Sequence, residues 1–249
     1  MPTAYYDDPD YDYQHYWSNR SYENQAEYRA LRCLLKNLVP IHSLIDIGAG
    51  FGRLVPVYKP YTTKITLAEP SQRMLAKAKQ LYNDYHNIEY LRAFAEDIPM
   101  PDQTFDTGLM VRTLHHLENP ETVFWEINRL LKPHGYLILE IPNKIHFIAK
   151  IRAFLKGNFK FAQDQNRTTV GTPGNHVAFY NYHPEKIKQL LSSTGFQVQK
   201  ILSVSNLRHP FLKKIIPLAL LIKIEQALQQ PLAKYYFGPS LFILCQKKK

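Results

Sequence analysis

The stretch that decides the fold of this chain is Leu44-Ile45-Asp46-Ile47-Gly48-Ala49-Gly50-Phe51-Gly52-Arg53-Leu54. A largely apolar run leads into three glycines that alternate with other residues, and a helical pattern follows. Because glycine has no Cβ, such a strand-to-helix turn lets the backbone come very close to a ligand. The stretch therefore predicts a loop that binds a nucleotide-like molecule.

The rest of the chain alternates between short apolar strands and amphipathic helices. The expected strands span 43–47, 64–68, 88–91, 105–111, 136–141, 196–204 and 240–246. The expected helices span 21–39, 53–58, 71–83, 120–131, 184–193 and 210–228. This alternation is typical of a parallel sheet with both faces covered, so we predict an α/β protein.

The composition is that of a globular protein with one large domain, or one domain with an insert. The chain has 249 residues, 45% of them hydrophobic, and no stretch reaches the roughly 18 apolar residues that span a bilayer. Its start lacks the basic and apolar regions of a signal peptide. Cys33 and Cys245 are expected to be core residues rather than disulfide or zinc ligands. These features predict a cytoplasmic protein.

The positive charge lies mainly in the C-terminal part of the chain. The formal net charge is +10, and residues 143–249 hold 17 of the 31 Lys and Arg but only three of the 21 Asp and Glu, an excess of +14. Such asymmetry favours an acidic partner: a nucleic acid, an anionic membrane surface or a phosphorylated substrate. The alternative is a basic surface that serves only solubility.

The glycine loop by itself is compatible with several nucleotide-binding folds. No Gly-Lys-Ser/Thr follows it, so it is not a P-loop, and its G-x-G-x-G spacing differs from the G-x-G-x-x-G of dinucleotide-binding folds. Glu69 ends the second expected strand, 17 positions after Gly52. A carboxylate at this point can accept hydrogen bonds from ribose hydroxyls.

Five blocks in a fixed order narrow the choice to one family. They are Leu-Ile-Asp-Ile-Gly-Ala-Gly-Phe-Gly (44–52), Leu-Ala-Glu-Pro-Ser-Gln-Arg-Met-Leu (67–75), Ala-Glu-Asp-Ile-Pro-Met-Pro-Asp-Gln-Thr-Phe-Asp (95–106), Leu-His-His-Leu-Glu-Asn-Pro (114–120) and Leu-Lys-Pro-His-Gly-Tyr-Leu-Ile-Leu (131–139). Together they resemble the class I S-adenosylmethionine-dependent methyltransferases, within the branch of ubiquinone- and menaquinone-biosynthesis-like enzymes (methyltransferase type 11). The resemblance implies a Rossmann-like, seven-stranded, mostly parallel sheet with helices on both faces and an antiparallel last strand. It also implies S-adenosyl-L-methionine as the cofactor.

The resemblance assigns roles to individual residues. The backbone at Gly48 and Gly50 would pack against the methionine part of the cofactor, and Asp46 would lie near its amino group. Glu69 would accept both ribose hydroxyls, since a carboxylate suits a vicinal diol. The cofactor-binding set implied in this way is Asp46, Gly48, Ala49, Gly50, Gly52, Glu69, Pro70, Phe94, Ala95, Glu96, Val111 and Arg112, with Tyr16 and Arg20 closing over the site.

Two of these positions are unusual for the family. Phe94 stands where many members carry an acid, and a phenyl ring can only stack on adenine. Recognition of the adenine amino group would then fall to Glu96, Asp97 or a backbone carbonyl. Arg112 is long and charged for a place beside the reacting sulfonium. It could bind the cofactor carboxylate or an acidic substrate, or it could turn to solvent.

The acceptor side of the site is marked less clearly. The catalytic candidates are His115 and Arg112, and the substrate-contact candidates are His115, His176, Tyr180 and His183. His116 is expected to fix its loop. Adjacent histidines point apart, and no cysteine or acidic cluster joins them, so no metal site is predicted. Methyl transfer from a sulfonium needs mainly alignment, and no residue stands out as a general base.

We expect four parts along the chain. Residues 1–40 form an N-terminal arm and helix that cover the cofactor site, and 41–142 form the cofactor-binding core. Residues 143–183 form a lid or substrate insert. Residues 184–249 complete the sheet and carry a basic apolar insert, 207–235, that either lies on a membrane surface, caps an apolar substrate or packs as a buried helix.

Three functions remain open at this point. The first is methyl transfer to a small-molecule or lipid-like acceptor, including anionic ones, by a cytoplasmic enzyme or one peripheral to a membrane. The second is methylation of RNA or another nucleic acid through the basic C-terminal part. Against it, the chain lacks the Asp/Asn-Pro-Pro-Tyr/Phe and Pro-Cys motifs of base methyltransferases. The third is a non-catalytic cofactor-binding partner protein.

Overall fold

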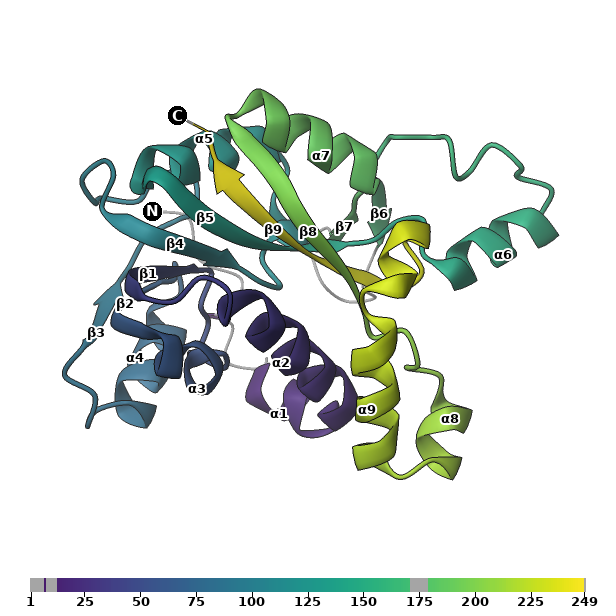
Figure 1. The fold of residues 1–249 in the computed structure, drawn as a ribbon, viewed down its shortest axis with the longest axis horizontal. Helices are drawn as coiled ribbons and strands as arrows, with labels where there is room; N and C mark the ends of the chain where they lie inside the picture. The colour runs from purple at the N-terminus through teal and green to yellow at the C-terminus, as the bar shows by residue number, and fades with distance from the viewer. Residues whose placement is uncertain (1–6, 8–12, 171–178, 249) are drawn as a thin grey trace.

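A seven-stranded sheet forms the centre of the molecule (Figure 1). The computed structural model describes residues 7, 13–170 and 179–248. The strands are β1 (Ile41–Ile47), β2 (Thr62–Ala68), β3 (Ile88–Leu91), β4 (Phe105–Met110), β5 (Leu131–Pro142), β8 (Phe196–Val204) and β9 (Ser240–Lys247). Their order is β3-β2-β1-β4-β5-β9-β8. β1 to β5 are parallel, and β9 is antiparallel to both β5 and β8, which confirms the predicted fold.

Helices cover both faces of the sheet (Figure 1). They are α1 (Tyr13–Ser18), α2 (Ser21–Leu35), α3 (Val55–Tyr58), α4 (Gln72–Leu81), α5 (Pro120–Leu130), α6 (Phe147–Leu155), α7 (Pro184–Ser193), α8 (Pro210–Ile215) and α9 (Leu218–Leu228). Side chains alternate along each strand. In β1, Leu44 therefore joins the core shared with α2, α3 and α9, whereas Ile45 joins the core shared with α5 and α7.

The basic insert differs from the single helix expected over 210–228. It consists of α8 and α9, separated at Pro217. Ile216 has an extended backbone, the conformation that a following proline favours. α9 buries Leu221, Ile222 and Glu225 against the rest of the protein. Packing is thus one function of this segment.

The expected insert 143–183 contains secondary structure that the sequence did not indicate. It holds α6 and a small hairpin of β6 (Thr168–Val170) and β7 (Phe179–Asn181).

None of the described helices is long and apolar enough to cross a membrane. Cys33 and Cys245 are free thiols, and Cys245 is buried.

No helix connects β3 to β4, and this leaves part of one sheet face uncovered. The connection, 92–104, is instead held by Arg129 of α5. The Arg129 guanidinium pairs with Asp102 at 2.7 Å and donates to the backbone carbonyls of Ile98 and Met100. Glu126 of α5 also accepts from the amide of Ile98 at 2.8 Å, so two residues of the neighbouring layer hold a loop that lacks its own helix.

Candidate functional site

The candidate site lies at the carboxyl edge of the parallel strands. The glycine loop follows β1, Glu69 follows β2, and Arg112 lies just beyond the end of β4. β1 and β4 are neighbours in the sheet, although the chain leaves β1 toward β2 on the opposite side. Ligands of open α/β sheets bind in the crevice at such a switch point.

The glycines allow a tight and closely approached turn. Gly48, Gly50 and Gly52 all have positive φ, between 57° and 77°, a region that other residues occupy only with strain. The amide of Gly48 donates to the carbonyl of Ala68 at 2.8 Å. A Cβ on Gly48 would lie 2.2 Å from Thr113 Oγ1. The loop therefore needs glycine because of its positive φ angles and, at Gly48, because no space is left for a Cβ.

Glu69 lies directly against this loop. Its side chain is almost fully buried, and its carboxylate accepts from the amide of Gly50 at 2.8 Å and from that of Ser71 at 2.9 Å. Burial raises the pKa of Glu69 to about 7, although both amides act in the opposite direction. Each carboxylate oxygen can accept more than one hydrogen bond. The glutamate thus keeps acceptor capacity for the hydroxyls of a ligand, which fits a ribose.

Asp46 has a structural partner that the sequence did not reveal. It is buried, and it accepts from the hydroxyl of Tyr58 at 3.0 Å. Burial raises its pKa to about 7 despite this hydrogen bond and the attraction of Arg53. The predicted contact between Asp46 and the cofactor amino group stays a prediction.

The N-terminal helix α1 covers the glycine loop. Trp17 packs with Phe51 of the loop and Met74 of α4 in a small buried cluster. The guanidinium of Arg53 stacks over the Trp17 ring at 3.7 Å. Farther toward the N-terminus, Asp7 accepts from the hydroxyl of Ser71 at 2.6 Å, directly beside Glu69. Both ends of the described arm therefore reach the candidate site.

Tyr16 and Arg20 lie at the junction of α1 and α2. The Arg20 guanidinium lies 4.1 Å from the centre of the Tyr16 ring. The Tyr16 ring in turn meets Trp17 edge-on at 5.5 Å. Their predicted closure over the cofactor is compatible with this position but is not tested by it.

A buried glutamate of α2, which the sequence did not single out, joins the arm to the site. Glu27 is fully buried and pairs with Arg53 at 2.6 Å and with Arg112 at 2.5 Å. Burial alone would raise the pKa of Glu27, but the guanidiniums of Arg112 and Arg53 hold it below its ordinary value. Glu27 lies on the same buried face of α2 as Ala26 and Ala30. An acid on an otherwise apolar helix face is the signal that could have identified it.

Arg112 neither turns to solvent nor stands free. Its guanidinium is held by Glu27, and its amide donates to the carboxylate of Glu140 in β5 at 3.2 Å. Its φ of 61° places it in the left-handed region, an uncommon conformation for a non-glycine residue. The two glutamates hold this conformation, so Arg112 is positioned by α2 and β5 together.

The two histidines form a stack with the hairpin. Their rings lie 4.0 Å apart, and Phe179 of β7 lies 5.2 Å from His115 and 5.0 Å from His116. Burial lowers the pKa of both, and the neighbouring His116 and Arg112 lower that of His115 further. Both imidazoles are thus neutral near pH 7. A neutral ring with so low a pKa is a weak proton acceptor.

The other acceptor-side candidates are spread along the insert. Tyr180 receives the guanidinium of Arg167 at 4.2 Å from its ring centre. His183 is buried and caps α7, accepting from the amide of Glu185 at 3.2 Å, while its other ring nitrogen lies 3.0 Å from the carbonyl of Ala162. This gives His183 a structural role. His176 falls outside the described residues.

The residues implied on the adenine side lie in the segment that follows β3. Ala95 is buried, Phe94 is partly buried, and Glu96 and Asp97 are exposed. The amide of Asp97 donates to the carbonyl of Phe94 at 3.3 Å, which forms a tight turn. The carbonyl of Pro70 accepts from the Arg92 guanidinium at 3.1 Å, and Val111 is buried just after β4. The roles implied for these residues stay predictions.

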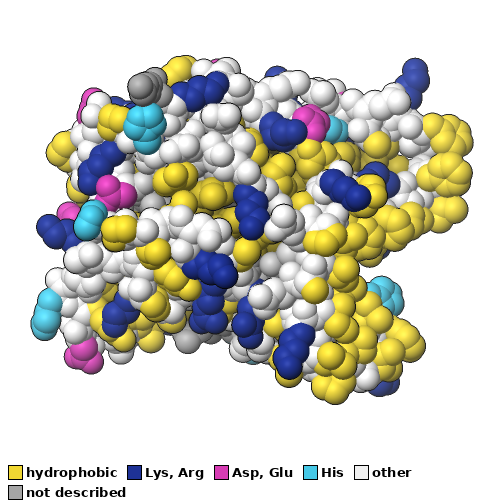
Figure 2. All heavy atoms as spheres, in the orientation of Figure 1, with side chains coloured by type: hydrophobic (Ala, Val, Ile, Leu, Met, Phe, Trp, Pro, Cys, Tyr) yellow, Lys and Arg dark blue, Asp and Glu magenta, His cyan; other side chains and the backbone are white. Residues whose placement is uncertain are grey.

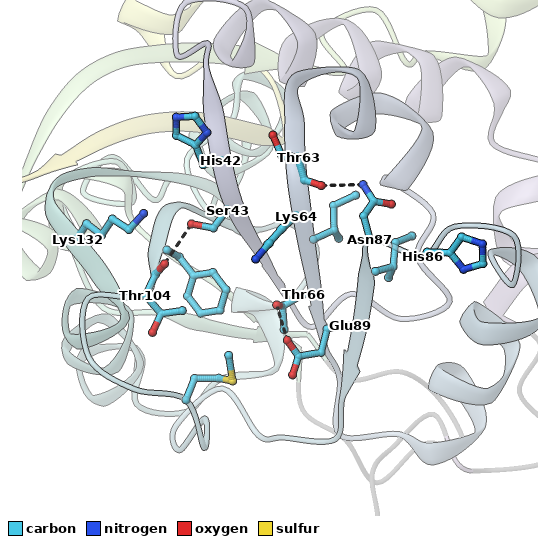
Figure 3. Close-up of a pocket in the computed structure, with 14 residues that line it drawn as sticks. His42, Ser43, Thr63, Lys64, Thr66, His86, Asn87, Glu89, Thr104 and Lys132 are labelled. Carbon is cyan, nitrogen blue, oxygen red and sulfur yellow. Dashed lines mark hydrogen bonds between the residues drawn. The ribbon is translucent and has the colours of Figure 1, made fainter.

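A cavity of about 810 Å³ lies elsewhere, over the face of the sheet that lacks a helix between β3 and β4 (Figure 3). Ser43 of β1 and Thr63 and Lys64 of β2 line it, from the amino-terminal halves of their strands. Neither the glycine loop nor Glu69 lines this cavity, so it is separate from the candidate site. Among residues 7, 13–170 and 179–248, no group of three His, Cys, Asp or Glu could hold a metal ion.

Comparison with known proteins agrees with the geometry. Residues 45–139 match the family described as a methyltransferase domain. A solved S-adenosylmethionine-dependent methyltransferase of Thermotoga maritima, described as a possible histamine N-methyltransferase, is 26% identical, covers 95% of both chains and superimposes with a TM-score of 0.64. Residues 45–139 are therefore a methyltransferase domain, and the chain as a whole resembles a solved S-adenosylmethionine-dependent methyltransferase.

The curated relatives of this chain match over part of their length. An uncharacterized protein of Methanocaldococcus jannaschii is 31% identical over 58% of this chain and 66% of its own. A demethylmenaquinone methyltransferase of Tropheryma whipplei is 29% identical over 52% of this chain and 54% of its own. The chain thus spans about half to two thirds of these relatives. The cyclase SpnF also shares the fold, at 18% identity and a TM-score of 0.56, so the fold alone does not define a reaction.

Proposed function

We propose that this protein transfers a methyl group from S-adenosylmethionine to a small-molecule or lipid-like acceptor that carries an anionic group. The observation that supports cofactor binding is the contact between Glu69 and the amide of Gly50 at the carboxyl edge of the sheet. A buried carboxylate beside a glycine turn can accept the ribose hydroxyls while the backbone approaches the rest of the cofactor.

The cofactor, when bound, supplies a methyl group that its sulfonium already activates. The task of the protein is then to align the acceptor and to exclude water. α1 serves the second task, because Trp17 and Phe51 cover the loop with apolar surface. Arg112 serves the first. Its side chain lies beside His115 at the end of β4, where the acceptor would approach.

The proposal of an anionic acceptor rests on a group of arginines around Arg112. Arg208 is exposed at the surface, and its pKa is lowered by the partial desolvation of its guanidinium and by the charges of Arg112, Arg20 and Arg152, whereas Glu23 acts in the opposite direction. The hydrogen bond from the amide of Leu207 to the Tyr22 hydroxyl brings Arg208 to the start of α2. Like charges held together are stabilised by an anion, such as a carboxylate or phosphate.

Labelled cofactor offers the direct test of this function. Transfer would be measured to acidic metabolites, quinone precursors, lipid extracts and RNA in parallel. We expect label on a small anionic or lipid-like acceptor. Arg208→Gln should raise KM for that acceptor about tenfold and leave the Kd of S-adenosylhomocysteine unchanged. Arg29→Gln, an exposed arginine on α2, is the control that should change neither.

Each contrary result has a clear meaning. Label on RNA alone would replace the small acceptor by a nucleic acid. Binding of S-adenosylhomocysteine without transfer to any acceptor would favour the non-catalytic partner. No binding at millimolar ligand would contradict the whole proposal.

A further inference from the structure

Two helical projections flank the candidate site and present apolar side chains to solvent. On α6 and the turn after it these are Ile151, Phe154, Leu155 and Phe159, and on α8 they are Phe211 and Ile215. Each is between 42% and 77% exposed. We call these six residues the apolar rim. No side chain of α6 or α8 is fully buried. Leu212 of α8 packs against the core and Phe147 of α6 stacks on Phe237, but these contacts leave the six rim residues exposed.

The topology places both projections at one edge of the molecule. α6 follows the carboxyl end of β5, and α8 follows the end of β8. β8 and β5 run in the same direction, because each is antiparallel to β9. Figure 1 shows α6 and α8 projecting on the same side, and Figure 2 shows hydrophobic side chains gathered on both projections. This is also the edge at which the cofactor site opens.

Basic side chains accompany the apolar rim. Arg152, Lys156 and Lys160 lie on the first projection, and Lys214 lies on the second; all four are exposed. The acids of this part of the chain do not offset them. Asp164 pairs with Lys144, and the other two acids of residues 143–249 pair with Lys188 or are buried in α9. The rim is therefore both apolar and cationic.

We propose that the apolar rim docks this protein on the surface of an anionic lipid bilayer. Amphipathic helices with Lys and Arg beside Phe and Leu bury their apolar face at the headgroup boundary, while the cations attract acidic lipids. Large apolar side chains that gather in solvent on each projection are typical of an interaction site. Charge decides the partner, because a second copy of this chain would bring the same positive charge to the contact. The proposal does not depend on the identity of the methyl acceptor.

Vesicle flotation of the full chain tests the proposal. Vesicles of phosphatidylcholine alone are compared with vesicles of phosphatidylcholine and phosphatidylglycerol. We expect binding to the anionic vesicles. The double variant Phe154→Ser with Leu155→Ser should weaken it about tenfold or more, because it removes two large apolar side chains from the contact. Lys156→Gln and Lys214→Gln should each weaken it about fivefold, and added salt should do the same.

Matched controls distinguish docking through the apolar rim from non-specific hydrophobic binding to vesicles. Leu81→Ser on α4 and Trp125→Ser on α5 remove exposed apolar side chains outside the rim, and both should bind vesicles as the wild type does. Every rim variant should keep the wild-type melting temperature and S-adenosylhomocysteine affinity. Absence of wild-type binding, equal binding to neutral vesicles, or unchanged binding of the double variant would overturn the proposal. So would a wild-type dimer that the double variant converts to monomers without a change in vesicle binding.

Discussion

Gly48 and Gly157 have the same φ of 72° but different surroundings. A Cβ on Gly48 would collide with Thr113, whereas a Cβ on Gly157 would meet nothing within 4 Å. Gly157→Ala should therefore show only the cost of a left-handed residue, about 1–2 kcal/mol. Gly48→Ala should cost more and should weaken S-adenosylhomocysteine binding at least tenfold, since Thr113 or the loop must move. Urea denaturation and calorimetry measure the two effects, and equal behaviour of the variants would contradict the close approach.

Glu69 should make cofactor binding depend on pH. Its pKa is raised to about 7 in the folded protein, and ribose hydroxyls donate best to the ionised carboxylate. Affinity for S-adenosylhomocysteine should therefore increase from pH 6 to pH 8. Stability should change in the opposite sense, because a raised carboxylate pKa means that stability is lost as pH rises toward 7.

Substitutions distinguish the contribution of Glu69 to this pH dependence from that of Asp46, whose pKa is also raised to about 7. Calorimetry at several pH values should show weak and nearly pH-independent binding for Glu69→Gln. Asp46→Asn should keep the pH dependence that Glu69 causes. Wild-type affinity in Glu69→Ala would contradict the ribose assignment.

At the scale of elements, one side chain connects α2 with the ends of β1 and β4. Glu27 neutralises Arg53 and Arg112 inside the protein. Removing one member of a buried ion network leaves the others uncompensated. Glu27→Gln should reduce the free energy of unfolding by about 3 kcal/mol and the Tm by roughly 10 °C. Glu121→Gln on the exposed side of α5 is the control, and a Tm for Glu27→Gln equal to that of the control would disprove the network's role.

α9 contributes buried side chains to the core, whereas α8 contributes only the partly buried Leu212. Glu225 of α9 is buried and accepts from the Tyr22 hydroxyl at 2.7 Å and from the Ser205 amide at 2.8 Å. The hydrogen bonds from α2 and from the segment after β8 therefore converge on α9. α8 offers no comparable buried group. The division at Pro217 thus separates a structural helix from an exposed one.

At the scale of the whole molecule, deletion of 207–235 should abolish folding rather than remove a separable insert. The deletion removes Leu221, Ile222 and Glu225 from the core shared with α2. We expect loss of the cooperative thermal transition and of S-adenosylhomocysteine binding together. Replacing only the exposed Phe211 and Ile215 by Ser should leave both intact. A cooperative transition in the deletion variant would show that α9 is dispensable.

The order of strands and helices along the chain and the glycine loop were readable from local patterns in the sequence, and the sheet topology followed from the family resemblance. Alternating short apolar runs predicted the strands within a few residues, and β8 and α7 have the predicted bounds. The sequence singled out Gly48 and Gly50 because glycine is the residue that adopts positive φ, as both do here. It singled out Glu69 as the acid that follows β2, and the structure places this acid against the amide of Gly50. The methyltransferase family followed from five such blocks in order.

Only the tertiary structure decided what depends on residues far apart in the chain. Glu27 and Arg112 are 85 positions apart, and no periodicity indicates that they pair. The same is true of the split between α8 and α9 and of the joint position of α6 and α8 at one edge. Sequence patterns record which side chains are apolar or charged. Which of them are buried, paired or left facing solvent is set by the strand order, because that order brings distant segments to the same edge.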